Sequence, residues 1–192
     1  MAQDIVTSHQ SPVASKKKLE TGDWKLAAIY MRILGIDPGI ARLGWAVVDE
    51  QKGRQKVIGF GCIETPKNKP DTERLTLLFE KLKKIIKKYK PEVMAVEDLF
   101  FAANVKTASR VGQARGVSLL ASALQKVPVK VYTPLKIKMA IVGYGRAEKK
   151  QVQQMVKTIL KLEKIPKPDD TADALAVALT HCFTHKFDKK IK

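Results

Sequence analysis

The chain has 192 residues, of which 45% are hydrophobic, so it can form one domain with a hydrophobic core, whereas two domains would be crowded. No apolar run approaches the roughly 18 residues of a membrane span, and the N-terminus lacks the apolar centre of a secretory signal, which argues against membrane and secreted proteins and predicts a cytoplasmic one. The formal charge of +17 predicts a polyanionic partner, nucleic acid above all, although a merely lysine-rich or ribosome-associated protein has the same composition.

The first 30 residues differ from the rest of the chain. They hold four lysines and three acids, so the other 162 residues carry +16 of the net charge. Because they lack helical or strand periodicity and have few bulky apolar side chains, we interpret residues 1–30 as a disordered extension. Met31 directly precedes the first predicted strand and is a candidate translation start. We expect one folded domain over residues 31–186 and a basic tail over residues 187–192.

The apolar pattern after Met31 first indicates strands and then alternates between helix and strand. Three successive strands, joined by glycine-containing turns as in an antiparallel meander, are predicted over residues 32–37, 43–49 and 56–64. Apolar residues at helical spacing, with lysines on the opposite face, predict a helix from Leu75 to Tyr89. Two more strands are predicted over 93–98 and 130–133, and helices over about 105–125, 134–141, 147–162 and 170–185. This order indicates an α/β fold with a five-stranded mixed sheet flanked by helices.

Acidic residues lie where predicted strands end and where the last helix begins. Asp37 ends the first strand and Glu97 the fourth, while Asp170 and Asp173 lie one turn apart on one face of the last helix. Each has an ordinary structural explanation on its own; Asp169 or Asp170, for example, suits an N-cap. Brought to one point, however, four carboxylates repel one another unless a cation neutralises them.

Such a set of ligands predicts a particular metal and a particular chemistry. Oxygen ligands without histidine or cysteine select Mg²⁺ or Mn²⁺ over zinc. In a basic protein, two such ions ~3.5 to 4 Å apart suit phosphodiester cleavage, because they activate a water and stabilise the leaving oxygen. Gly35 and Gly39, on either side of Asp37, are expected to leave room for the backbone of a nucleic acid.

Four stretches resemble, in order and spacing, the RuvC family of bacterial Holliday-junction resolvases, namely MRILGIDPGIARLGWAVV, AVEDLFFAANVKTASRVGQARG, IVGYGRAEKKQVQQMV and PDDTADALAVALTHC. The resemblance runs from Met31 to about His185, and the set is specific, although GIDPG alone also opens actin-like ATPases and sugar kinases. It implies an RNase H-like fold and a homodimer that nicks two strands of a four-way DNA junction symmetrically. It also implies that the branch-migration proteins RuvA and RuvB are partners of this protein.

The resemblance further implies roles for single residues. Its catalytic metal-binding acids fall on Asp37, Glu97, Asp170 and Asp173, with two Mg²⁺ ions expected and Mn²⁺ as a substitute. The third position is Asp or His in the family, and Asp169 lies beside it. DNA-contacting positions fall on Lys138, Lys149 and Phe100; the alternative for Phe100 and its neighbour Phe101 is core packing, whereas stacking on unpaired bases is the functional interpretation.

Other interpretations stay open at this point. A non-catalytic junction-binding scaffold would keep the fold and the basic surface, but the presence of all four acids argues against it. Another RNase H-like activity, such as RNA cleavage or an ATPase, is a third hypothesis, and the ATPase lacks a clear second glycine-rich phosphate loop. Gly112 and Gly116 predict close helix packing, against either the sheet or a second subunit. His181 and His185 are interpreted as surface residues rather than zinc ligands.

Overall fold

The computed structural model describes residues 30–98 and 105–188. One five-stranded sheet has the strand order β3-β2-β1-β4-β5 and is built from β1 (Tyr30–Asp37), β2 (Arg42–Gln51), β3 (Arg54–Glu64), β4 (Val93–Glu97) and β5 (Val129–Tyr132). The first three strands are antiparallel neighbours, and β4 and β5 join them in parallel pairs. The predicted mixed five-stranded sheet is therefore confirmed, with strand ends within a few residues of the expected ones.

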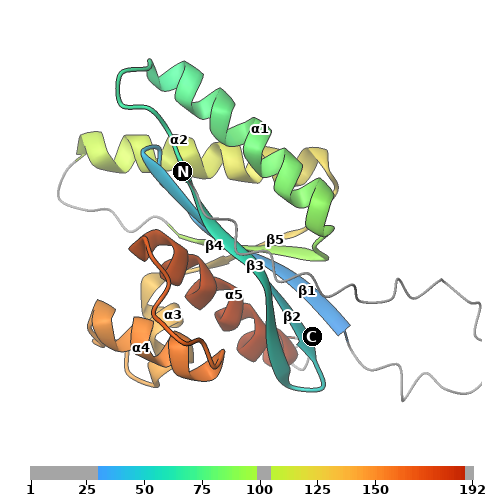
Figure 1. The fold of residues 1–192 in the computed structure, drawn as a ribbon. Coiled ribbons are helices and arrows are strands. Elements are labelled where there is room, and N and C mark those ends of the chain that lie inside the picture. The colour runs from blue at the N-terminus through green and yellow to red at the C-terminus, as the bar shows by residue number, and fades with distance from the viewer. Residues whose placement is uncertain (1–29, 99–104, 189–192) are drawn as a thin grey trace, which may run out of the picture.

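Helices cover both faces of this sheet (Figure 1). On one face lie α1 (Asp71–Tyr89) and α2 (Val105–Leu124). On the other face lie α3 (Pro134–Val142), α4 (Lys149–Ile159) and α5 (Asp169–Asp188). Among the described residues, no helix combines the length and the apolar character that a bilayer crossing needs.

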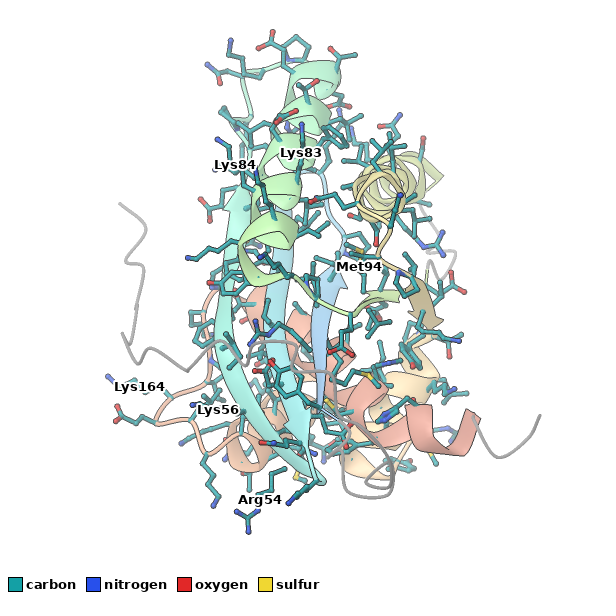
Figure 2. All side chains as sticks on the ribbon, turned by 90° about the vertical axis from the view of Figure 1, so that its right-hand side faces the viewer. Arg54, Lys56, Lys83, Lys84, Met94 and Lys164 are labelled. Carbon is teal, nitrogen blue, oxygen red and sulfur yellow. The ribbon has the colours of Figure 1, made fainter. Side chains whose placement is uncertain are left out.

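Side chains of the strands alternate between the two helical layers. On β1, Leu34 and Ile36 belong to the core under α1 and α2, whereas Ile33 belongs to the core under α5. Met94 of β4, which is fully buried, points into the α1 and α2 layer, while lysines such as Lys83 project from the outer side of α1 (Figure 2). This alternation decides which face receives the residues at the strand ends.

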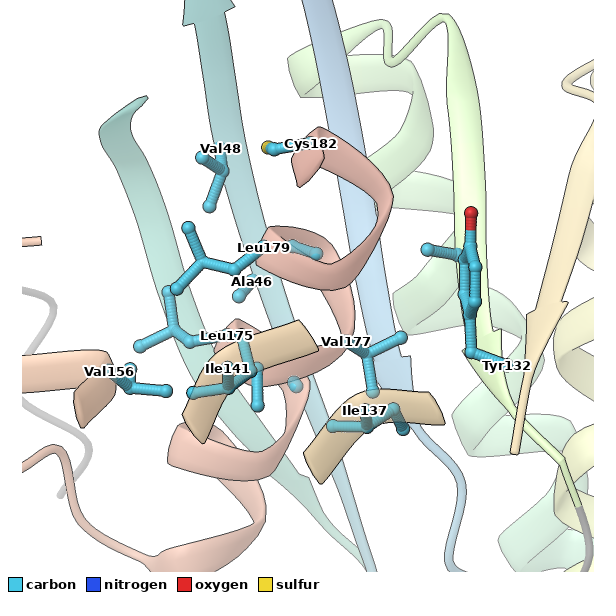
Figure 3. Packing of buried hydrophobic residues seen from close by; sticks show 14 of the residues in the cluster. Ala46, Val48, Tyr132, Ile137, Ile141, Val156, Leu175, Val177, Leu179 and Cys182 are labelled. Atoms are coloured by element: carbon cyan, nitrogen blue, oxygen red, sulfur yellow. The ribbon is translucent and has the colours of Figure 1, made fainter. Parts of the chain in front are cut away.

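Helix α5 is the central helix of the fold, because it packs between the sheet and the pair α3 and α4. Side chains from all these elements meet in one core, labelled in Figure 3 as Ala46, Val48, Tyr132, Ile137, Ile141, Val156, Leu175, Val177, Leu179 and Cys182. A helix enclosed on several sides is apolar nearly all round. That accounts for the sequence from Ala174 to Leu179, whose six residues are all buried.

The two histidines of α5 are buried, so their interpretation as surface residues is wrong. His181 is 3% exposed and His185 is 5% exposed. The Tyr132 hydroxyl and Nδ1 of His181 lie 2.6 Å apart, and Nε2 of His185 lies 3.4 Å from Oε2 of the buried Glu50. Nδ1 of His185 also lies 2.9 Å from the carbonyl oxygen of His181, so each ring has a hydrogen-bonding partner in the core. The i, i+4 pair therefore reflects a polar contact with β2 and β5 inside the core.

Candidate active site

Asp37 and Glu97 meet at one edge of the sheet. Each is the last residue of its strand, and β1 and β4 are parallel neighbours in which Ile36 pairs with Val96. Since side chains alternate along a strand, both carboxylates fall on the face that α5 covers. Parallel strands end at the same edge, so the fold itself brings these two acids together.

Glycines let the first turn of α5 approach this edge closely. Gly44 of β2 pairs with Asp37, and a Cβ on Gly44 would collide with the carbonyl oxygen of Asp170. A Cβ on Gly35 would collide with the carbonyl oxygen of Ala174. The absence of side chains at both positions therefore allows α5 to lie directly on β1 and β2, with Asp170 and Asp173 beside Asp37.

The expected role of Gly35 and Gly39 is consequently corrected. Gly35 makes room for α5, and a Cβ on Gly39 would meet the carbonyl oxygen of Arg42 in the turn that joins β1 to β2. Gly35 is therefore covered by α5 rather than open to nucleic acid, whereas Gly39 has a role in the turn and also lines a surface cavity. The N-cap expectation is also wrong, because α5 begins at Asp169, which places Asp169 and Asp170 inside its first turn, where their charge favours the helix dipole.

The electrostatics of the site show an excess of negative charge. Burial, followed by repulsion from Glu97, Asp173 and Asp170, raises the pKa of Asp37 from 3.8 to about 8. Burial and the charge of Asp173 raise the pKa of Glu97 from 4.5 to about 7. Burial also raises the pKa of Asp173, against the opposing effect of Lys149. Asp37 is therefore repelled by the other three predicted acids, and such a concentration of negative charge attracts a cation.

Lysines from α3 and α4 reach the same site. Gln151 accepts a hydrogen bond of 2.8 Å from the backbone N–H of Glu148, which fixes the start of α4 at Lys149. Lys149 Nζ lies 2.8 Å from Oδ2 of Asp173 and 3.8 Å from Oδ2 of Asp169. Lys138, one turn into α3, is close enough to lower the pKa of Glu97. Both predicted lysines therefore lie at the acidic edge.

Two arginines that sequence reasoning did not single out also contact this edge. Arg42 Nε lies 3.2 Å from Oδ2 of Asp170, and Arg115 lies 3.4 Å from Asp98, the residue after Glu97. The signals in the sequence were weak: Arg42 stands five residues after Asp37, and Arg115 is the arginine of the GQARG motif. Phe100, the remaining predicted site residue, lies outside the described residues.

The carboxylates have the chemistry of a divalent-cation site, but their present arrangement is not that of a formed one. Among residues 30–98 and 105–188, no three His, Cys, Asp or Glu side chains stand close enough together to hold a metal ion. The ion pairs supply a physical reason, because Arg42 and Lys149 each hold one aspartate of α5. Oxygen-only donors with raised pKa values nevertheless fit Mg²⁺ or Mn²⁺, which would relieve their repulsion.

Comparison with known proteins agrees with this geometry. The family model for the crossover junction endodeoxyribonuclease RuvC matches residues 33–181. RuvC of Alkaliphilus oremlandii is 51% identical over 162 residues, covering 84% of this chain and 99% of the relative. RuvC of Desulforamulus reducens is 52% identical over 163 residues, covering 84% of this chain and 100% of the relative.

Solved structures give the same result. Thermus thermophilus RuvC, in complex with a Holliday junction substrate, is 36% identical with a TM-score of 0.78, covering 82% of this chain and 96% of that one. The yeast mitochondrial Holliday junction resolvase Ydc2, 16% identical with a TM-score of 0.57, shares the fold. The expected RNase H-like fold is therefore confirmed. The chain belongs to the RuvC family of crossover junction endodeoxyribonucleases.

Proposed function

We propose that this protein is a structure-selective endonuclease that resolves four-way DNA junctions by nicking two strands symmetrically in a metal-dependent reaction. The observation that carries the proposal is the meeting of Asp37, Glu97 and the first turn of α5 at one edge of the sheet. Relatives at about half identity over nearly their whole length bear the name of this activity. The products expected are 5′-phosphate and 3′-hydroxyl ends, which a ligase can seal.

Asp37, Glu97, Asp170 and Asp173 are proposed to hold the divalent ions, two Mg²⁺ per site, with Mn²⁺ as a substitute. When bound, such ions activate a water and stabilise the leaving oxygen. The residues themselves supply negative charge in a buried position. Because the pKa of Asp37 is about 8 and that of Glu97 about 7, both carry a substantial fraction of protons at neutral pH. Cation binding at this site should therefore release protons.

Basic residues beside the acids are proposed to receive the DNA backbone. Lys149 and Lys138 lie at the acidic edge, and the whole chain carries +17, so a phosphate near the acids meets cations within the same site. Lys149 also keeps Asp173 in place at 2.8 Å. Phe100 stands three residues after Glu97 in the sequence, and we propose that it stacks on unpaired junction bases.

We infer that the protein acts as a homodimer through α2. Leu120 is 52% exposed and Leu124 is 65% exposed, and with Gly116 they follow an i, i+4, i+8 stripe along the helix. A Cβ on Gly116 would meet no atom within 4 Å, so this glycine does not serve packing against the sheet. An exposed apolar stripe of this kind suits a second copy of the chain. Sedimentation of Leu120→Asp, with Leu135→Asp as the control for another exposed leucine, should show monomers only for the first.

The wider setting is proposed on the same basis. RuvA and RuvB are the expected partners for branch migration. Cys62 and Cys182 are not joined by a disulfide, which accords with a reducing compartment such as the cytoplasm.

The test is cleavage of an end-labelled synthetic four-way junction in Mg²⁺ with linear duplex as competitor. The parent protein should give paired symmetric nicks, and Asp37→Asn should bind the junction without cutting it. Glu80→Gln, which changes an exposed acid on α1, is the control and should cut normally. Selective binding of the junction without cutting in Mg²⁺ or Mn²⁺ would favour the scaffold hypothesis, and indifference to junction over duplex would refute both.

A further inference from the structure

Arg42 and Asp170 form an ion pair of an unusual kind. Arg42 Nε lies 3.2 Å from Oδ2 of Asp170, yet this buried oxygen has no hydrogen-bond partner. The guanidinium group therefore neutralises the carboxylate by proximity, without the directed N–H···O geometry that makes charge-assisted bonds strong. The arginine side chain is 52% exposed, whereas that of Asp170 is 23% exposed. Such a contact is easily exchanged for another partner.

A surface cavity lies next to this ion pair and could receive another partner for Arg42, such as a phosphate group. Its volume is about 340 Å³, and its lining includes the turn residues Gly39 to Arg42, together with Arg110, Val111 and Asp170. Arg110, 59% exposed, reaches Asp71 with 3.0 Å between Nε and Oδ2. Two arginines therefore border one cavity at the acidic edge. Guanidinium groups suit phosphate oxygens through paired N–H donors.

We propose that Arg42 changes partners during the reaction: it holds Asp170 in the free protein and moves to a backbone phosphate of the junction in the complex, which frees Asp170 to become a metal ligand. This inference rests on the proposed metal-dependent nuclease function. It explains why the described carboxylates do not already form a metal site, since one of them is held toward Arg42.

The exchange has a thermodynamic consequence. A guanidinium and a divalent cation that share one carboxylate repel each other, so each weakens the binding of the other. DNA removes this competition by taking Arg42. Because such coupling is reciprocal, DNA should favour metal binding and metal should favour DNA binding through this residue. Lys149 contrasts with Arg42, because Lys149 is hydrogen-bonded to Asp173 at 2.8 Å, whereas the facing oxygen of Asp170 has no hydrogen bond.

The experiment compares Arg42→Gln with Arg54→Gln as the matched control. Arg54 pairs with Gln51 at the hairpin end of β2 and β3, whereas Arg42 pairs with Glu64 at the opposite end, and about nine residues of strand separate them by ~30 Å. Figure 2 shows Arg54 at that tip of the molecule. First, Mn²⁺ binding is measured without DNA from the EPR signal of free Mn²⁺. Second, junction binding is measured in EDTA over a series of NaCl concentrations. This is done for each arginine variant by itself and for the same variant combined with Asp170→Asn.

Arg42→Gln should bind Mn²⁺ about threefold or more tightly than the parent, since the competing cation is gone. It should bind the junction more weakly, with the salt slope lowered by about one. The loss in junction affinity should be at least about twofold larger in the Asp170→Asn background, where Arg42 is no longer held. Arg54→Gln should leave Mn²⁺ affinity unchanged.

Two results would overturn the exchange. Unchanged Mn²⁺ affinity in Arg42→Gln would mean that Arg42 does not compete with the metal. Equal losses of junction affinity in both backgrounds would mean that Asp170 does not restrain Arg42. Failure of the proposed function would look different, because the parent itself would then bind Mn²⁺ no better than Asp37→Asn and the junction no better than duplex.

Discussion

Replacing Asp37 by asparagine should stabilise the metal-free protein even though it abolishes cleavage. The carboxyl group is buried among other acids, so its pKa is raised from 3.8 to about 8. The folded state therefore binds this proton more tightly than the unfolded state, and stability falls as pH rises through the window between these two values. An amide at position 37 carries no charge and does not incur this loss.

The size of the effect follows from the pKa values. Each tenfold change in an ionisation equilibrium is worth ~1.4 kcal/mol, so the full interval corresponds to roughly 5 to 6 kcal/mol. Rotation of the side chain toward solvent and uptake of buffer cations relieve part of this energy. We expect Asp37→Asn to gain ~2 to 4 kcal/mol at pH 8 and less than ~1.5 kcal/mol at pH 5. At pH 8 the gain corresponds to about 5 to 10 °C in Tm.

Urea denaturation in EDTA at pH 5 and pH 8 measures this difference, with Glu80→Gln as a control that should change little. In saturating Mg²⁺ at pH 8 the parent should become more stable than Asp37→Asn, because a cation that binds only the folded parent adds to its stability. An equal gain at both pH values would refute the reasoning, since the benefit would not then come from ionisation. A loss of stability at pH 8 in EDTA would refute it as well.

Three further substitutions test other parts of the site. Gly44→Ala should cost ~1 to 3 kcal/mol in urea denaturation, because its methyl group displaces the backbone at Asp170, and should lower single-turnover cleavage at least ~100-fold. Lys149→Gln should move the rising limb of the pH–rate profile to higher pH, because Asp173 loses the cation that opposes its raised pKa. His185→Ala should cost ~2 to 4 kcal/mol in the same denaturation assay, because it removes a buried side chain of α5 and leaves a cavity beside Glu50, but folded protein should cut normally. Lys164→Gln is the control for Lys149 and should leave the profile in place, whereas loss of cleavage in correctly folded His185→Ala would contradict its structural role.

The fold could be predicted from the sequence because apolar residues recur with the period of a strand in some segments and with the period of a helix in others. Apolar residues alternate along β1, β2 and β3 and recur at helical spacing along α1. These are local patterns, and each indicates which surface of the element is buried. The acids at strand ends were also predictable, because parallel strands end at one edge of a sheet. Their nearness to α5 came from family resemblance, since nothing local in the sequence indicates which strand a later helix will cover.

What the sequence did not predict depends on contacts between distant segments. Gly35 was expected to face a nucleic acid, but it contacts the backbone of Ala174, about 140 positions later in the chain. His181 was expected at the surface, since histidine is only intermediate in its tendency to be buried, but α5 is enclosed and Tyr132 of β5 supplies a partner. Arg42 was one of 36 basic residues, and only its distance from Asp170 distinguishes it.

The charges of this protein affect DNA in opposite ways at long and at short distances. At long range, +17 attracts DNA, with an influence that fades over about a Debye length, ~8 to 10 Å at moderate salt. At short range, the acids at the end of β1 and β4 repel the same phosphate that must reach them. Cations at the site have to offset the repulsion between these carboxylates and the phosphate. The chain places two such cations, Lys149 and Arg42, directly against Asp173 and Asp170. A phosphate that enters therefore meets Arg42 already positioned for the proposed exchange, which would leave Asp170 open to a metal ion while Lys149 stays against Asp173.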